Sequence, residues 1–213
     1  MSNDAQPLPD GPEFLPIVQC GDPVLRRQAD ALAPSDVRRP DVQQLIRRMR
    51  ATMEAAPGVG LAAPQVGESI QLAVLSDGPE RFGHLTADEL AARERSTVPF
   101  TVLVNPILVH LADERGPAGF FEGCLSVPRL TGFVRRRRVV RVNGLDEHGE
   151  PRSWIFSGWP ARIAQHEIDH LAGVLYLDRV ETRSISTVEN YVERWAGRSP
   201  AEAAAALGFK TTP

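Results

Sequence analysis

Residues 165–173 read Gln-His-Glu-Ile-Asp-His-Leu-Ala-Gly and contain the pattern His-Glu-x-x-His, in which two histidines four residues apart bracket a glutamate. In a helix, four residues turn through about 400°, so His166 and His170 project from one face. Both imidazoles can then bind one metal ion, and Glu167 can reach a water molecule on that metal. The stretch therefore predicts a metal site on a helix.

The residues around this pattern predict that the helix is buried. Ile163 extends the histidine face, and Gly173 is a typical helix end. A second apolar row is formed by Ala164, Ile168, Leu171 and Leu175. A helix that is apolar on more than one side lies in a core. The same pattern also arises by chance in charged surface helices, but buried histidines without a partner are costly, which favours the metal site.

The bulk composition is typical of a globular protein. The 213 residues are 42% hydrophobic and 24% charged, with a net charge of −3. This balance gives no general attraction to nucleic acid or to a membrane, so we expect neither a membrane partner nor a specific nucleic-acid partner. Cys20 and Cys124 are far apart in the sequence, which favours a reducing cytoplasm over a disulfide framework.

The pattern along the chain predicts one domain with two flanking segments. Residues 1–14 are rich in proline and acidic residues and predict a flexible tail, without the features of a signal or transit peptide. Residues 15–197 form the expected domain, and residues 198–213 a C-terminal extension. Within the domain, apolar periodicity predicts a helix over residues 41–56, strands over 70–75 and 100–109, and a hairpin over 134–157. Residues 77–98 are polar and predict an insertion between strands.

We therefore expect an α+β fold, with antiparallel sheets packed around a buried helix over residues 162–172. The helix over residues 41–56 covers the outside of this arrangement. A further short helix is expected over residues 186–195, followed by an alanine-rich segment.

Two other stretches carry residues that suit chemistry. Residues 58–67 combine glycines with small residues, which lets the backbone approach another group closely, and Gln65 is the one neutral amide donor there. Residues 122–128 include Cys124. This cysteine could be a nucleophile, an inert core thiol or the third ligand of the His166/His170 metal, and the last role fits best because a thiolate readily completes a two-histidine site.

Taken together, the three stretches resemble peptide deformylase. That family carries G-x-G-x-A-A-x-Q, matched by residues 58–65, E-G-C-x-S, matched by 122–126, and Q-H-E-x-D-H-L-x-G, matched by 165–173. The motifs occur in the family order, and the resemblance spans residues 16–195. Residues 157–159 and the segment after residue 177 are similar to the branch that includes the organellar enzymes, while the lack of a transit sequence favours a bacterial, cytoplasmic protein.

The resemblance implies removal of the N-formyl group from the formyl-methionine of nascent polypeptides, with release of formate. Cys124, His166 and His170 would hold one divalent metal, Fe(II) in the native enzyme, with Zn, Ni or Co also able to bind. Glu167 would then act as the proton carrier, and Gln65 with the Leu125 backbone N–H would stabilise the oxyanion. The partners implied are N-formylmethionyl nascent peptides, and a transient contact with the ribosome is left open.

The methionine side chain needs an apolar pocket, which the resemblance assigns to Gly58, Val59, Gly60, Leu61 and Ile163. Arg162 departs from this pattern, because an apolar residue is expected one turn before His166.

Two rival functions remain open at the level of sequence. The first is an endopeptidase that uses the same His-Glu-x-x-His pattern and would need a third ligand downstream of His170. The second is a metal-binding relative without activity, although a structural site would need neither Glu167 nor Gln65.

Overall fold

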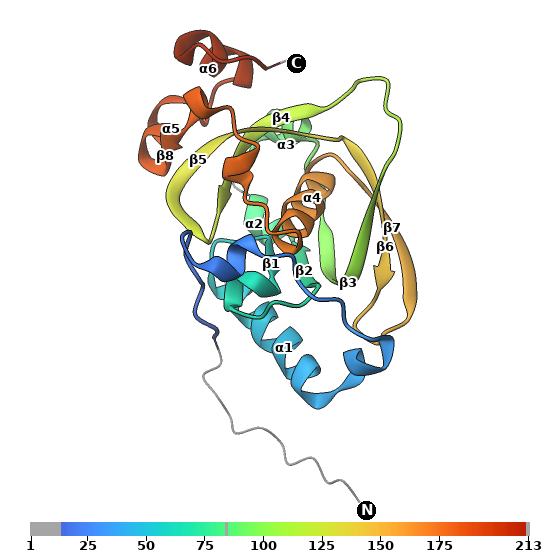
Figure 1. Cartoon of the computed structure of the whole chain (residues 1–213). Coiled ribbons are helices and arrows are strands. Elements are labelled where there is room, and N and C mark those ends of the chain that lie inside the picture. The colour runs from blue at the N-terminus through green and yellow to red at the C-terminus, as the bar shows by residue number, and fades with distance from the viewer. Residues whose placement is uncertain (1–13, 84, 212–213) are drawn as a thin grey trace, which may run out of the picture.

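The computed structural model describes residues 14–83 and 85–211 and has a mixed α+β fold (Figure 1). The predicted tail over residues 1–14 therefore lies almost wholly outside the described part of the chain. A five-stranded sheet has the order β1-β2-β3-β6-β7, and a three-stranded sheet has the order β4-β5-β8. The strands are β1 (Gly60–Ala62), β2 (Leu72–Asp77), β3 (Val98–His110), β4 (Ala118–Cys124), β5 (Val127–Arg136), β6 (Val139–Leu145), β7 (Pro151–Ser157) and β8 (Ser186–Thr187).

Every pairing between these strands is antiparallel, as the sequence predicted. The α-helices are α1 (Pro40–Ala55), α2 (Pro79–Phe82), α3 (Ala87–Arg93), α4 (Trp159–Leu171), α5 (Val188–Arg194) and α6 (Pro200–Leu207). The expected hairpin is the β6–β7 pair, which runs in register from Val139 opposite Ser157 to Leu145 opposite Pro151.

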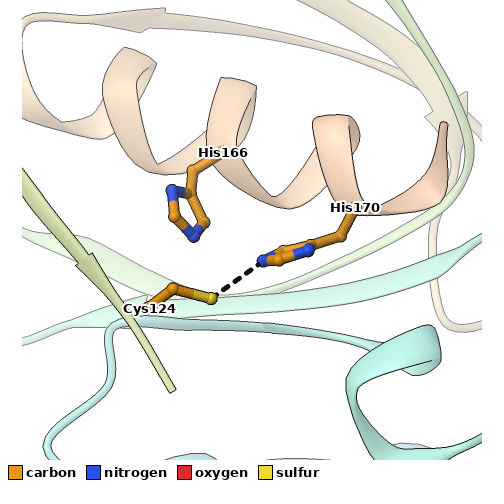
Figure 2. Close-up of side chains that lie close together, drawn as sticks. All are labelled: Cys124, His166 and His170. Atoms are coloured by element: carbon orange, nitrogen blue, oxygen red, sulfur yellow. Dashed lines mark hydrogen bonds between the residues drawn. The ribbon is translucent and has the colours of Figure 1, made fainter. Parts of the chain in front are cut away.

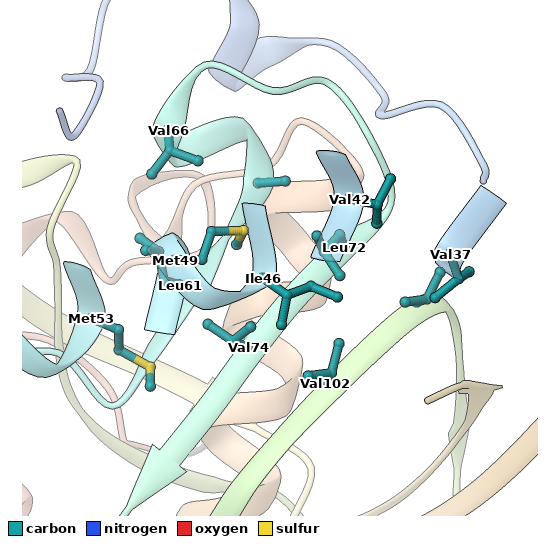
Figure 3. Packing of buried hydrophobic residues seen from close by; sticks show 12 residues of the cluster. Val37, Val42, Ile46, Met49, Met53, Leu61, Val66, Leu72, Val74 and Val102 are labelled. Atoms are coloured by element: carbon teal, nitrogen blue, oxygen red, sulfur yellow. The ribbon is translucent and has the colours of Figure 1, made fainter. Parts of the chain in front are cut away.

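Helix α1 covers one face of the five-stranded sheet, as its apolar spacing predicted. Pro40 occupies the first turn, where its missing N–H costs nothing. The buried side of the helix, drawn in Figure 3, consists of Val42, Ile46, Met49 and Met53. These side chains pack with Leu61, Leu72, Val74 and Val102 of the sheet in one hydrophobic cluster. Burial of this face fixes the strand β1 that runs beside the candidate site.

Helix α4 contacts both sheets and is buried along most of its length. It begins after Gly158, whose φ of 62° favours glycine, and it ends before Gly173, whose φ is 73°. The predicted helix end at Gly173 is therefore confirmed. After this end, a 3-10 helix forms over Tyr176–Asp178, with the Asp178 side chain accepting a hydrogen bond from the Leu175 backbone N–H.

The C-terminal extension packs on the rest of the protein. Helix α6 brings Ala203 and Ala204 against Phe121 and Phe133. Phe209 joins this aromatic group, with its ring centroid 5.1 Å from that of Phe133. Figure 1 shows α5 and α6 beside the β4–β5 hairpin. Residues 198–211 thus form an extension, and the apolar side of this extension packs against the domain.

Candidate metal centre and active site

Three side chains from two distant parts of the chain meet in one cluster (Figure 2). Cys124 ends strand β4, and His166 and His170 lie on consecutive turns of α4. One ligand atom from each residue lies within 4.8 Å of the others, and Cys124 Sγ is 3.3 Å from His170 Nε2. The two imidazole rings are 4.9 Å apart between centroids. The spacing of four residues on a helix accounts for this geometry.

Glu122 fixes the orientation of the first histidine. His166 Nδ1 lies 3.0 Å from Glu122 Oε2, and the carboxylate also accepts two hydrogen bonds of 2.9 Å from Arg136. Burial acts to raise the pKa of Glu122, but Arg136, His166 and Arg162 hold that pKa well below 4.5. An ionised carboxylate can only accept, so His166 donates from Nδ1. In the neutral imidazole, Nε2 is then left with a lone pair for a metal.

Arg162 is directed at this carboxylate. Its Nη1 donates to Glu122 Oε1 and to the Val134 carbonyl, and its Nη2 donates to the Ala118 carbonyl at 2.6 Å. The side chain is 5% exposed. Glu122 thus pairs with the positive charge at the position where the sequence pattern expected an apolar residue, and Arg162 also lines the cavity.

Glu167 follows His166 on α4, and its side chain is buried. Burial raises the pKa of its carboxyl to about 7. Its Oε2 is buried without a hydrogen-bond partner among the described residues. A Cβ at position 60 would overlap this carboxyl group, so only glycine lets the β1 backbone approach so closely. Gly60 therefore shapes the space around Glu167.

Gln65 places its amide beside Cys124. Gln65 Oε1 accepts a hydrogen bond of 2.9 Å from the Ala62 N–H, which assigns the amide nitrogen to the opposite side. That Nε2 lies 3.4 Å from Cys124 Sγ and 3.3 Å from Ser126 Oγ. The Gln65 side chain is thus a fixed N–H donor at the edge of the cluster.

The donor set fits a divalent transition metal. A thiolate and two imidazoles are ligands that suit Zn, Fe, Co and Ni, and three protein ligands leave one position of a tetrahedral site open. Glu122 supplies the outer hydrogen bond that such a histidine ligand needs. Within the described ranges, His170 Nδ1 is buried without a hydrogen-bond partner.

The cluster opens into a cavity of about 640 Å³. Of the residues expected in the pocket, Gly58, Val59, Gly60 and Ile163 line it, as does Leu125. Leu61 does not, because side chains alternate along strand β1 and that of Leu61 is fully buried in the cluster under α1. The lining also includes residues that the motifs did not indicate, namely Arg95, Phe121, Arg129, Trp159 and Val188.

Of these five residues, Trp159 could have been found from the sequence, together with Arg162. Trp159 and Arg162 stand seven and four residues before His166, so helical periodicity places them on the face of Ile163 and His166. Arg95, Phe121, Arg129 and Val188 come from other elements and carry no such signal.

Together, the fold and the cluster define an enzyme-like cleft with three side chains that could hold a metal ion. Comparison with known proteins then gives the family: the model for "Polypeptide deformylase" matches residues 14–186. "Peptide deformylase 3" of Streptomyces avermitilis is 50% identical over 202 residues, covering 92% of this chain and 84% of that protein. "Peptide deformylase 1A, chloroplastic/mitochondrial" of Arabidopsis thaliana is 42% identical over 82% of this chain and 64% of its own length. The chain belongs to the peptide deformylase family.

Solved structures agree with this assignment. The "Met-ala-ser bound crystal structure of class I type b peptide deformylase from Acinetobacter baumannii" matches with a TM-score of 0.68 and 34% identity, over 78% of this chain and 98% of that one. The peptide deformylase of Synechococcus elongatus in complex with actinonin matches with a TM-score of 0.66 and 34% identity, over 96% of this chain and 91% of that one. The resemblance inferred from three motifs is confirmed, and the chain is a family enzyme.

Proposed function

We propose that this enzyme hydrolyses the N-formyl group of formyl-methionyl peptides and releases formate together with the free amine. The observation that carries the proposal is the buried Glu167 carboxyl group, whose Oε2 lacks a hydrogen-bond partner among the described residues and which lines the same cavity as Cys124 and His166. A carboxyl group with a pKa raised by burial can carry a proton near neutral pH.

Cys124, His166 and His170 would hold one divalent metal. Fe(II) is the expected native ion, and Zn, Ni or Co suit the same ligands. When bound there, the metal supplies a Lewis acid that makes water nucleophilic at neutral pH and polarises the formyl oxygen. Glu122, fixed by Arg136 and Arg162, keeps His166 in the tautomer that can bind it.

Residues of the chain supply the proton transfer and the stabilisation of the oxyanion. Glu167 accepts a proton from the attacking water and returns it to the amine when the carbon–nitrogen bond breaks. Negative charge that develops on the formyl oxygen is stabilised by the Gln65 amide and the Leu125 backbone N–H, each contributing a few kcal/mol. Gly60 lets the Glu167 carboxyl group approach the backbone of β1 closely.

The first side chain of the substrate would occupy the apolar part of the cavity. Gly58, Val59, Gly60 and Ile163 line this part, and Leu61 supports it from the layer behind. The Acinetobacter baumannii structure described above was determined with Met-Ala-Ser bound, which supports a methionyl product as the ligand of such a cavity.

The proposed setting is the bacterial cytoplasm, where formyl-methionyl nascent peptides are the partners, with transient contact to the ribosome. The relatives from Streptomyces and Bifidobacterium support a bacterial origin. Among the described residues, no helix is long and apolar enough to cross a membrane.

The test is to incubate the protein without oxygen with formyl-Met-Ala-Ser and to measure formate and free amine separately. We expect the two products in equal amounts and no cleavage of acetyl-Met-Ala-Ser-Ala at an internal bond. Internal cleavage without formate would identify an endopeptidase instead. Metal-loaded protein that releases neither product would support a binding protein without activity.

A further inference from the structure

The polar segment between β2 and β3 reaches the candidate active site. It contains α2 and α3, and it turns back at Glu94, which has a left-handed φ of 49°. The next residue, Arg95, lines the same cavity as Cys124 and His166. A segment that looked like a surface insertion thus contributes a charged side chain to the cavity wall.

A buried ion pair holds Arg95 in place. Asp77, the last residue of β2, accepts two hydrogen bonds of 2.8 Å from the Arg95 guanidinium group. The Asp77 side chain is fully buried and that of Arg95 is 12% exposed. The bidentate pairing offsets the desolvation cost of burying the two charges and leaves the guanidinium group few alternative positions.

Aromatic rings flank the same guanidinium group. Its carbon lies 5.1 Å from the ring centre of Phe82 and 5.5 Å from that of Trp159. Phe82 belongs to the segment, whereas Trp159 begins α4 and also lines the cavity. Stacking on aromatic faces fixes the plane of an arginine without blocking its hydrogen bonds. Arg95 is therefore a rigid part of the wall.

The segment is also joined directly to the start of α4. The Glu94 carbonyl accepts a hydrogen bond of 3.1 Å from the Trp159 N–H, one of the donors that a helix leaves unpaired in its first turn. A Cβ at position 158 would overlap this carbonyl, so Gly158 permits the close approach. Glu94 further pairs with Arg138. These contacts set the position of Arg95 relative to α4.

The α4 residues that line the cavity show in which direction it extends from His166. Trp159, Ile163 and His166 share one helix face, and the rise from residue 166 to residue 159 is roughly 10 Å. All three residues line the cavity, and Arg95 stacks on the ring farthest along the helix from the metal ligand. A side chain that starts near His166 and extends along this face meets Trp159 and Arg95 at its end.

We propose that Arg95, held by Asp77 and stacked on Trp159, forms the end wall of the pocket for the first side chain of the substrate. It is a specificity-determining residue, because its position limits the length of that side chain. The proposal rests on the deformylase function proposed above. The inserted segment between β2 and β3 is thereby assigned to substrate selection.

The test compares two substrates on the same enzyme. One is formyl-Met-Ala-Ser, and the other replaces methionine with a residue that bears an unbranched hexyl side chain. The ratio of their kcat/KM values does not depend on the fraction of protein that is folded. In Arg95→Ala we expect this ratio to move toward the longer side chain by about ten-fold, as a change of pocket size commonly gives. Arg93→Ala, in the same segment but away from this cavity, should leave the ratio unchanged.

A second variant covers the case in which Arg95→Ala unfolds because Asp77 is left unpaired. Asp77→Asn with Arg95→Gln replaces the ion pair by two neutral amides and shortens the side chain at position 95, so it should shift the ratio in the same direction. If every variant that still turns over formyl-Met-Ala-Ser keeps the wild-type ratio, the end-wall role is wrong. Absence of deformylation by the wild-type protein would instead overturn the proposed function, so the two failures are distinguishable.

Discussion

At the scale of single residues, the Glu122 carboxylate is the point where the site is fixed. Arg136, Arg162 and His166 all donate to it, and each is largely buried. Removing one partner of a buried charged group is costly, because the remaining group keeps its desolvation penalty. The candidate metal ligand His166 is therefore linked to Arg136 and Arg162 through Glu122.

We predict that Arg162→Met weakens metal retention. The loss of one donor loosens Glu122 and hence His166, and changes of this kind typically lower metal affinity by about 10–100-fold. The measurement is the rate of metal loss to a chelator, with Arg141→Met on the exposed side of β6 as the matched control. Equal rates of loss for both variants would show that Arg162 does not position the site.

Glu167→Gln should abolish most of the activity without loss of metal. The amide matches the shape of the carboxyl group but cannot accept the proton, and general acid–base catalysis commonly contributes about 10²–10⁴-fold. Formate release and metal content are measured on the same sample, with the half-exposed Glu147→Gln as control. Turnover close to that of the wild type would remove Glu167 from the proton-carrying role.

The contribution of Glu167 to the stability of the metal-free protein should fall as pH rises from 4.5 to about 7. Burial raises the pKa of Glu167 to about 7 in the folded state, whereas the unfolded chain loses this proton near 4.5. Between these values the folded state binds more protons, so raising the pH favours unfolding. Measured by denaturant unfolding, the stability of the wild type relative to that of Glu167→Gln should therefore decrease across this range. Identical pH profiles would contradict a raised pKa.

At the scale of elements, the C-terminal helix α6 and the residues after it support the β4–β5 hairpin. Phe121 lies in the aromatic group with Phe133 and Phe209 and also lines the cavity. Strand β4 ends in Cys124, so the hairpin carries both a cavity wall and a candidate ligand. The packing of the extension is therefore connected to the site through one short strand.

Phe209→Ala should lower the free energy of unfolding by about 3 kcal/mol, which is typical for truncation of a buried phenylalanine. Phe209 is 9% exposed and stacks on Phe133, which is fully buried. Denaturant unfolding measures the effect, and Lys210→Ala, at the neighbouring exposed position, is the control. An effect of Phe209→Ala no larger than that of the control would mean that the extension adds no stability.

At the scale of the whole molecule, local pattern predicted the elements that have strong periodicity. The α1 face, the end of α4 at Gly173 and the β6–β7 hairpin follow from residue spacing and turn residues alone. The three motifs also led to the family and to the cluster of Cys124 with the two histidines. The helix face, the helix end and the hairpin depend on neighbours in sequence. The cluster depends on residue types that are typical of a metal site.

What the sequence could not show depends on contacts between distant segments. The orientation of Leu61 follows from the pleat of β1 and the position of α1. The roles of Arg162 and Arg95 depend on partners 40 and 18 residues away, Glu122 and Asp77. The packing of α6 needs the aromatic face of β4 and β5, which only the assembled sheet presents. In each case tertiary packing decides the role of a residue that local pattern left open.

The most direct measurement is deformylation of formyl-Met-Ala-Ser by metal-free protein to which Ni(II) or Co(II) is added stepwise without oxygen. The account predicts that activity rises in proportion to bound metal and stops rising at about one metal per chain, while Cys124→Ala shows no such rise. Full activity without metal, or no activity at one bound metal per chain, would contradict it.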